Sequence, residues 1–265
     1  MEERVFHIDQ DGYQKMELTP DAQTSYTFHI DKRRNANLSI TYSGGKTHLT
    51  QRFICEEGAT LRVLIQNQMQ ELTLQESDEL YQDATLMIGY LEMEQGISHV
   101  NAHYALKEQG ANAHIMSACI TSGEKHYELS CEHEVPHTKG LMENYAVIKE
   151  HANYSMKAVG KIRKGAHDSE SHQASRVLTL SKDQRSEVIP LLLIDENEVK
   201  ASHATTLGQP DENQLYYLQT RGLTRDMALG LLTIGYLLPI TEILEDEELA
   251  MTLKNEIEMK VGLHA

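Results

Sequence analysis

Apolar and polar residues alternate in short runs over the first 208 residues of the chain. Clear examples are the runs at 24–30, 37–42, 60–65 and 114–120. A period of two places every second side chain on one face, which is typical of β-strands. We therefore predict that residues 1–208 form a region built from β-strands.

The pattern changes to a helical period beyond this region. Asp211 and Thr224 are suited to begin two helices, because short polar side chains accept hydrogen bonds from free backbone N–H groups. Gly222 stands where the first of these helices would end. With a third helix over 245–261, residues 209–265 are predicted to form a C-terminal helical region. The apolar side chains of its second helix are expected to pack on the strands: Met227, Leu231, Ile234 and Leu238.

Short corners of similar chemistry precede several of the strand-like runs. Each has a polar or charged residue, usually a Gly, and then an Ala, and they stand at 57–60, 109–112, 150–153 and 164–167. A corner repeated before each strand favours a solenoid of β rungs, in which each rung buries its apolar face on the next. The irregular spacing leaves a β-sandwich with long loops as an alternative.

Composition narrows the class of function. The chain has 24 Lys and Arg against 40 Asp and Glu, a formal net charge of −16, so we expect neither nucleic-acid nor membrane binding. It has no Trp and only three Phe, which weakens any aromatic platform for bases or sugars. The N-terminus lacks a signal-peptide pattern, and the longest apolar stretch, 227–240, is too short to span a bilayer. We expect a cytoplasmic protein.

Candidate reactive groups are few. No Walker motif or Gly-x-Ser-x-Gly elbow is present, so we predict that the chain is not an enzyme. The odd number and wide spacing of Cys55, Cys119 and Cys131 indicate reduced thiols. Cys131 and His133 lie two residues apart, as zinc or iron ligands could, but no further ligand completes the set. A buried thiol beside surface histidines is the favoured interpretation, and the fourteen histidines predict adventitious metal affinity only.

Several sequence blocks follow one another in the second half of the chain: Gly160-Lys161-Ile162, His172-Gln173, Pro190 to Leu193, Val199 to His203 and Gln214 to Gly222, with His133-Glu134-Val135-Pro136-His137-Thr138 upstream. In this order they resemble the core signature of the SufB/SufD family of iron–sulfur cluster assembly proteins. The chain is more similar to the D-type members and is shorter than many of them. The resemblance implies a mainly β fold, a right-handed parallel β-helix over roughly 25–208 with a small C-terminal helical region.

The resemblance also implies a function, that of a non-enzymatic scaffold or adaptor in SUF-type iron–sulfur cluster assembly. Family members pair through the β-helix and dock SufC, an ABC-type ATPase, through the C-terminal helices. We therefore expect a SufC-like ATPase to dock on residues 209–265, and a SufB-like protein or a second copy of this chain to pair with the β-helix as a dimer. Tyr216, Tyr217 and Arg221 are candidate partner-binding residues, because Tyr and Arg are enriched at interfaces.

This chain departs from the family where cluster ligands are proposed. Alanine stands at three of those positions: Ala174, Ala201 and Ala204. His203 remains, and we predict that it is a metal ligand at a cluster site shared across the dimer interface. The isolated chain is expected to bind no stable cofactor. Transient binding of an iron–sulfur cluster at the shared interface remains an alternative.

Two other functions remain as alternatives. A β-helix enzyme that acts on polysaccharides would need paired carboxylates and aromatic sugar platforms in a cleft, which the shortage of Trp and Phe disfavours. A degenerate structural relative could bind the ATPase but no cluster. The alanines at the proposed ligand positions favour this second alternative as the runner-up.

Overall fold

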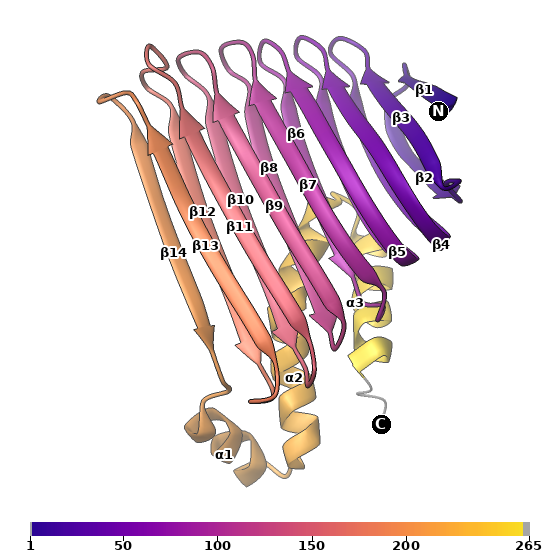
Figure 1. The fold of residues 1–265 in the computed structure, drawn as a ribbon, viewed down its shortest axis with the longest axis vertical. Helices are drawn as coiled ribbons and strands as arrows, with labels where there is room; N and C mark the ends of the chain where they lie inside the picture. Colours follow the sequence, from indigo (N-terminus) through magenta and orange to yellow (C-terminus); the bar gives the residue numbers. More distant parts are fainter. Residues whose placement is uncertain (1, 262–265) are drawn as a thin grey trace.

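The fold is a parallel β-helix of about seven turns followed by a small C-terminal helical region (Figure 1). It is seen in a computed structural model that describes residues 2–261. The predicted fold class is confirmed, and the β-sandwich alternative is wrong because every strand pair is parallel.

The strands in chain order are β1 (Glu2–Ile8), β2 (Gly12–Leu18), β3 (Gln23–Ile30), β4 (Asn35–Cys55), β5 (Thr60–Leu80), β6 (Thr85–Glu92), β7 (Ile97–Leu106), β8 (Asn112–Thr121), β9 (Glu124–His133), β10 (Lys139–Ile148), β11 (Asn153–Ile162), β12 (Glu170–Thr179), β13 (Arg185–Ile194) and β14 (Lys200–Gly208). The strands end at Gly208, where the alternation ends. The predicted start of the β-helix near residue 25 is too late, because β1 and β2 already pair with β3 and β4.

Successive strands alternate between two faces of the β-helix. Strands β6, β8, β10, β12 and β14 follow one another on one face, and β7, β9, β11 and β13 on the other. The long strand β5 connects the faces, since its residues 60–66 pair with β6 and its residues 71–80 with β7. We call the first the helix-covered face, because α2 packs on β8, β10 and β12 (Figure 1), and the second the open face.

The corners between strands use the left-handed backbone region. Gly58, Gly110, His151 and Gly165 have φ angles of 67°, 80°, 64° and 91°. Glycine favours this region because it has no Cβ. The residue that follows each of them is a buried alanine, at 59, 111, 152 and 166. A small side chain is needed there because the position is enclosed by the adjacent rungs.

Equivalent positions stack directly on one another in the interior. Phe6, Phe28 and Phe53 occupy one register position on β1, β3 and β4, and their rings stack with centroids 4.8 Å apart at both steps. These are all three phenylalanines of the chain. Stacked aromatic pairs add to the stabilisation that comes from burial. This ladder therefore holds the first rungs together.

The interior also contains a buried ion pair. Lys125 of β9 lies 2.6 Å from Glu92 of β6, and both side chains are almost fully enclosed. Ser98 donates to Glu92 at 2.5 Å and accepts from Lys125 at 3.1 Å, and Asn67 donates to Glu92 at 3.2 Å. Because a charge without a partner is costly away from water, these contacts make the pair tolerable in the core.

A second polar group lies nearer the N-terminus. Glu76 and Asp78 project inward from β5, and Asp78 Oδ1 accepts a hydrogen bond from the backbone N–H of Phe53 at 2.8 Å. Glu76 also accepts hydrogen bonds from Tyr90 and Gln51. Burial raises the pKa of Glu76 to about 7 and raises the pKa of Asp78 well above its usual value. The two carboxyl groups therefore hold protons at pH values where exposed acids are ionised.

The helical region comprises α1 (Glu212–Thr220), α2 (Arg225–Leu237), the 3-10 helix η1 (Leu238–Ile243) and α3 (Glu247–Val261). The predicted caps are confirmed. Asp211 accepts from the backbone N–H of Asn213 at 2.8 Å, and Thr224 accepts from that of Met227 at 3.2 Å. Gly222, with a φ of 96°, follows α1 in the left-handed region.

The face of α2 that packs on the strands differs from the expected one. Ile234 is buried as predicted and Leu238 is half-buried, but Met227 and Leu231 are 43% and 45% exposed. The buried stripe instead includes the small residues Ala228, Gly230 and Thr233. Small side chains allow a close approach to the sheet, and a pattern of large apolar residues does not reveal them.

By length and composition Arg225–Ile243 would pass as a membrane-spanning helix, and 39% of that window is buried against the rest of the chain.

Candidate functional site

The last rung of the β-helix is uncovered on its outer side. Among residues 2–261, β13 pairs only with β11, and β14 only with β12. Both strands are largely solvent-accessible, and they expose the apolar side chains of Ile189, Leu193 and Leu207, which are 38%, 50% and 44% exposed. We call β13 and β14 together the open end.

His203 lies at this open end. Parallel pairing places it opposite Gln173, and Gln173 is a buried residue that faces the interior of the β-helix. Paired residues of neighbouring strands share a face, so His203 lies on the inward side of a rung that nothing covers in the described chain. The same register places Ala204 opposite Ala174. The positions singled out from the family pattern are therefore brought together in the first half of β12 and β14.

A close-packed polar layer lies directly beneath His203. Gln173 donates from Nε2 to the backbone oxygen of Leu191 at 2.9 Å, while its Oε1 and the Oγ of Ser171 have no hydrogen-bond partner within the described residues. A Cβ on Gly160 would lie 2.4 Å from Ser171 Oγ and 3.0 Å from Gln173 Nε2. Glycine at this position of the Gly-Lys-Ile block is therefore explained by the close approach of these side chains.

Cys131 and His133 also lie close together, on β9, one rung before Gly160 of β11. His133 Nδ1 is 2.8 Å from Thr138 Oγ1, and its Nε2 has no hydrogen-bond partner in the part of the chain that is described. Cys131 Sγ and His133 Nε2 both approach Gly140, since a Cβ there would lie 2.8 Å and 3.0 Å from them. The expectation that His133 lies on the surface is wrong: it is fully buried, because its position on β9 faces inward.

The three cysteines are free thiols, as predicted, and all are buried. Burial raises the pKa of Cys131 to about 12 and raises the pKa values of Cys55 and Cys119 far above the usual thiol value. Burial also lowers the pKa of His133 to about 4. Thiolates are the form that ligates iron, so a metal ion that bound one of these thiols would have to displace a proton that is held more tightly than usual.

The candidate partner-binding residues lie on α1. Tyr216 and Tyr217 are 71% and 57% exposed. Arg221 donates from Nη2 to the hydroxyl oxygen of Tyr217 at 3.3 Å, and its Cζ lies 5.2 Å from the centre of that ring. Tyr217 also lines a cavity of about 410 Å³ between α1 and α2, together with Asn213, Gln214, Leu218 and Leu232. The arrangement presents an exposed aromatic surface next to a hollow.

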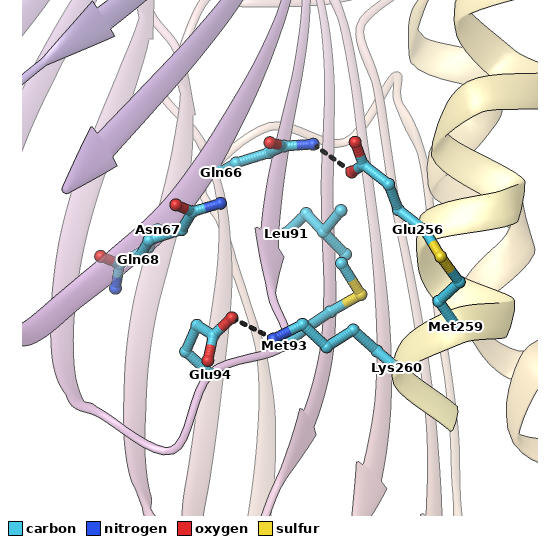
Figure 2. Close-up of a pocket in the computed structure, with 9 residues that line it drawn as sticks. All are labelled: Gln66, Asn67, Gln68, Leu91, Met93, Glu94, Glu256, Met259 and Lys260. Atoms are coloured by element: carbon cyan, nitrogen blue, oxygen red, sulfur yellow. Dashed lines mark hydrogen bonds and ion pairs between the residues drawn. The ribbon is translucent and has the colours of Figure 1, made fainter. Parts of the chain in front are cut away.

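Another cavity, of about 420 Å³, lies between α3 and the strands β5 and β6 (Figure 2). Gln66 donates to Glu256 at 3.3 Å across this space, and Lys260 forms an ion pair with Glu94. Both contacts join α3 to the β-helix. The cavity is thus bridged by contacts that hold the helix in place.

Groups of side chains that could hold a metal ion occur outside β13 and β14. Three such groups are present in the described residues, and their members are His7, His29 and Asp31; His99, Glu124 and His126; and His137, His167 and Asp168. Each combines residues from different rungs, so no spacing along the sequence marks them. Only the length of a rung, known from the fold, could have identified them in advance.

Comparisons with known proteins agree with this architecture. The family model described as "SUF system FeS cluster assembly, SufBD core domain" matches residues 18–236. The chain therefore belongs to the SufB/SufD family of the SUF system. Iron-sulfur cluster assembly protein SufD of Bacillus subtilis is 39% identical over 124 residues, which are 47% of this chain and 28% of that protein.

Two further relatives extend the match. An iron-sulfur cluster assembly SufBD family protein of Mycobacterium bovis is 29% identical over 153 residues, 57% of this chain and 18% of the relative. Iron-sulfur cluster assembly protein SufB of Bacillus subtilis is 21% identical over 219 residues, 81% of this chain and 42% of the relative. The chain thus matches less than half of the length of each of these proteins.

Proposed function

We propose that this chain is a non-enzymatic scaffold or adaptor in SUF-type iron–sulfur cluster assembly. It pairs through the open end with a SufB-like protein or with a second copy of itself, and it docks a SufC-like ABC ATPase through its helical region. The observation that carries the proposal is the uncovered last rung, with exposed apolar side chains on β13 and β14.

Two physical arguments support pairing at the open end. Unpaired strand edges attract further strands, and proteins normally cover or blunt them. Contiguous exposed apolar surface on a folded protein marks an interaction site. The open end has an unpaired edge and exposes apolar side chains. Leu207 lies opposite the buried Val177 and so faces the uncovered interior, and a partner that adds its own last rung would satisfy the backbone and bury this side chain.

Pairing would also complete the surroundings of His203. This imidazole is accessible and stands beside the buried Gln173, with alanines at the other candidate ligand positions. One histidine cannot hold an iron–sulfur cluster, which usually needs four ligands. His203 would therefore act as one ligand of a site whose other ligands come from the partner, and the cluster would be cargo in transit.

The ATPase would dock on α1. Tyr216 and Tyr217 offer large side chains with few rotatable bonds, and Arg221 is already oriented by its contact with Tyr217. Residues of these types contribute most of the binding energy at many interfaces. The buried part of α2, in contrast, is occupied by packing on β8, β10 and β12.

Co-purification with SufB-like and SufC-like proteins tests the proposal. Leu207→Lys is expected to abolish capture of the SufB-like protein and leave that of the ATPase unchanged. Tyr216→Ala together with Tyr217→Ala should do the reverse, while Met251→Ala on α3, also exposed, should change neither. Point variants are preferable to removing every residue after Gly208, because that deletion would uncover apolar strand residues such as Met116. Retention of both partners by both variants would contradict the proposal.

The runner-up is a relative that binds the ATPase but takes no part in holding a cluster. Ala174, Ala201 and Ala204, together with the protonated, buried Cys131, favour it. Anaerobic reconstitution with iron and sulfide distinguishes the two. If the chain together with a SufB-like partner holds no more iron than the partner alone, the runner-up is correct. The polysaccharide-acting alternative has no support from the family match.

A further inference from the structure

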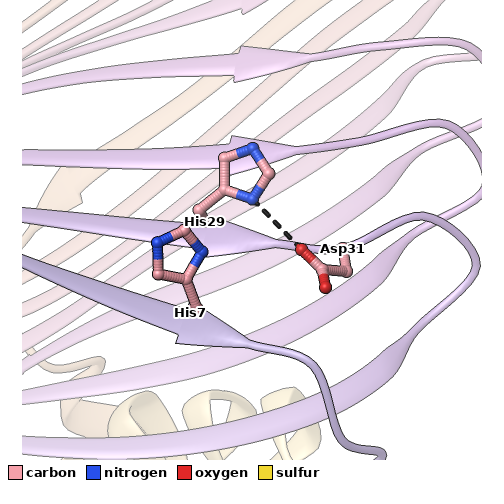
Figure 3. A group of neighbouring side chains, drawn as sticks. All are labelled: His7, His29 and Asp31. Carbon is pink, nitrogen blue, oxygen red and sulfur yellow. Dashed lines mark hydrogen bonds and ion pairs between the residues drawn. The ribbon is translucent and has the colours of Figure 1, made fainter.

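We propose that His7, His29 and Asp31 form a binding site for a divalent first-row transition metal ion, with zinc as its best fit. The site lies on the first rungs, remote from the open end, and is independent of the proposed function. Figure 3 shows the three side chains, with the histidines on neighbouring strands and Asp31 just beyond the end of β3.

The backbone itself brings the ligands together. His7 of β1 and His29 of β3 are paired in register, and one ligand atom from each of the three residues lies within 4.8 Å of the others. His29 Nδ1 is 3.3 Å from Asp31 Oδ1. Two ligand atoms on a tetrahedral zinc ion, each about 2.0–2.1 Å from the metal, are separated by roughly 3.3–3.4 Å. This pair therefore already has the spacing that the metal requires.

A fourth residue fixes the orientation of the central ligand. His29 Nε2 lies 3.1 Å from Glu56 Oε1, on the side of the ring opposite to Asp31. When His29 is neutral and donates from Nε2 to this carboxylate, its Nδ1 lone pair is directed towards Asp31 and His7. A carboxylate behind a ligating histidine is the usual outer partner of zinc-bound imidazole and increases its basicity. Glu56 is thus a positioning residue rather than a ligand.

The geometry distinguishes this group from the other two. The rings of His7 and His29 are tilted by 48°, so lone pairs in their planes can converge on one ion. The rings of His99 and His126 stack with a tilt of only 20°, which keeps their lone pairs side by side. In the third group, His167 Nδ1 is 2.8 Å from Asp168 Oδ2, which is shorter than the roughly 3.3–3.4 Å between two ligand atoms of a tetrahedral zinc ion.

A bound ion would have a structural consequence. Strand β1 pairs only with β3 in the described chain, so it is an edge strand. A metal that bridges His7 on β1 and His29 on β3 would fasten this edge to the rest of the β-helix. With three protein ligands, the fourth position would be left to water, as in zinc sites that remain open.

Zinc binding by the full chain tests the proposal. The protein is stripped with a chelator, dialysed against zinc at low micromolar concentration and assayed for bound metal and for its melting temperature. We expect one tightly bound equivalent that raises the melting temperature, lost in His7→Ala and in His29→Ala. Glu56→Gln keeps the shape of the positioning residue and should weaken binding by about 10–100-fold. Cobalt absorption in the visible range reports the ligand geometry independently.

The matched control is His114→Ala. His114 is also half-buried and lies 2.8 Å from a carboxylate, that of Glu143, but it belongs to none of the three groups. It should bind zinc as the wild type does. The proposal is wrong if the wild type takes up no zinc under these conditions, or if His7→Ala and His29→Ala retain as much zinc, as tightly, as His114→Ala. Circular dichroism confirms that each variant is folded before its metal content is compared.

Discussion

His203 on β14 lies directly opposite Gln173 on β12, in the last strand pair of the helix-covered face. Gln173 is buried and its Oε1 has no partner in the described chain, whereas His203 is exposed. One more rung, added on β14, would therefore enclose the imidazole of His203 beside the amide of Gln173. The pair marks the boundary between the completed β-helix and the surface that we propose a partner covers.

Replacement of His203 should affect the shared site and leave the fold intact. His203→Ala removes an exposed side chain, so the melting temperature should hardly change. In the complex with a SufB-like partner, however, we expect fewer iron atoms per complex and weaker visible absorbance after anaerobic reconstitution. His172→Ala is the control, because His172 lies on the outer side of β12 and contacts Ser202 at 2.7 Å. Equal iron contents of the two variants would show that His203 is not a ligand.

The buried ion pair predicts a large difference between two lysines. Lys125→Ala should lower the free energy of unfolding by about 3–5 kcal/mol, because it leaves the Glu92 carboxylate buried without its partner. Lys157→Ala removes a pair of similar length, 2.7 Å, with Glu128 on the surface, and should cost no more than about 1 kcal/mol. Denaturant unfolding followed by circular dichroism measures both. Equal losses would mean that the interior is hydrated around Lys125.

The carboxyl pair in the core predicts that stability depends on pH in an unusual direction. Because the folded-state pKa of Glu76 is about 7, the folded chain holds a proton that the unfolded chain releases near pH 4.5. The contribution of Glu76 is therefore complete below about pH 4.5 and is lost as the pH rises to about 7 and above. His133, with a folded-state pKa of about 4, acts in the opposite sense and destabilises the fold as the pH falls below 6.5.

Glu76→Gln separates the two effects, because His133 is present in both proteins and cancels in the comparison. Glutamine resembles the protonated acid, so the variant should resemble the wild type at pH 5. At pH 8 it should be more stable than the wild type, because glutamine carries no charge that burial penalises. Urea unfolding at the two pH values provides the comparison. A stability difference that does not change with pH would show that Glu76 is ionised in the folded protein throughout.

The corners favour a solenoid because they carry local chemistry, but their irregular spacing leaves the β-sandwich open, and it is the family resemblance that predicts the β-helix. Gly58 and Ala59 supply a left-handed residue and a small buried one next to each other, and this order recurs. A corner without glycine is harder to recognise: the one at His151 is part of the pattern, but the one at Asp83 is not, although Asp83 adopts the same conformation with a φ of 54°. The first rung lies within the strand region predicted for residues 1–208 but outside the predicted β-helix, because the side chains of β2 are largely exposed and the inward–outward pattern there is weak.

The candidate sites could be predicted only in part. His203 was identified from its sequence block, but its position opposite Gln173 depends on the strand register. Inward-facing polar residues such as Glu76 and Lys125 cannot be told from outward-facing ones by alternation, because both are polar. The His7 and His29 pair is separated by one rung, and rung length is a property of the fold rather than of any local motif.

Sedimentation equilibrium of the isolated chain at tens of micromolar tests the central proposal, pairing through the open end, most directly. In the absence of a SufB-like partner we expect a homodimer, about twice the 30.0 kDa of one chain. Leu193→Lys together with Leu207→Lys, on the exposed surface of β13 and β14, should convert it to a folded monomer. A wild-type protein that sediments strictly as a 30.0 kDa monomer, or a dimer that these two substitutions leave intact, would contradict the proposal.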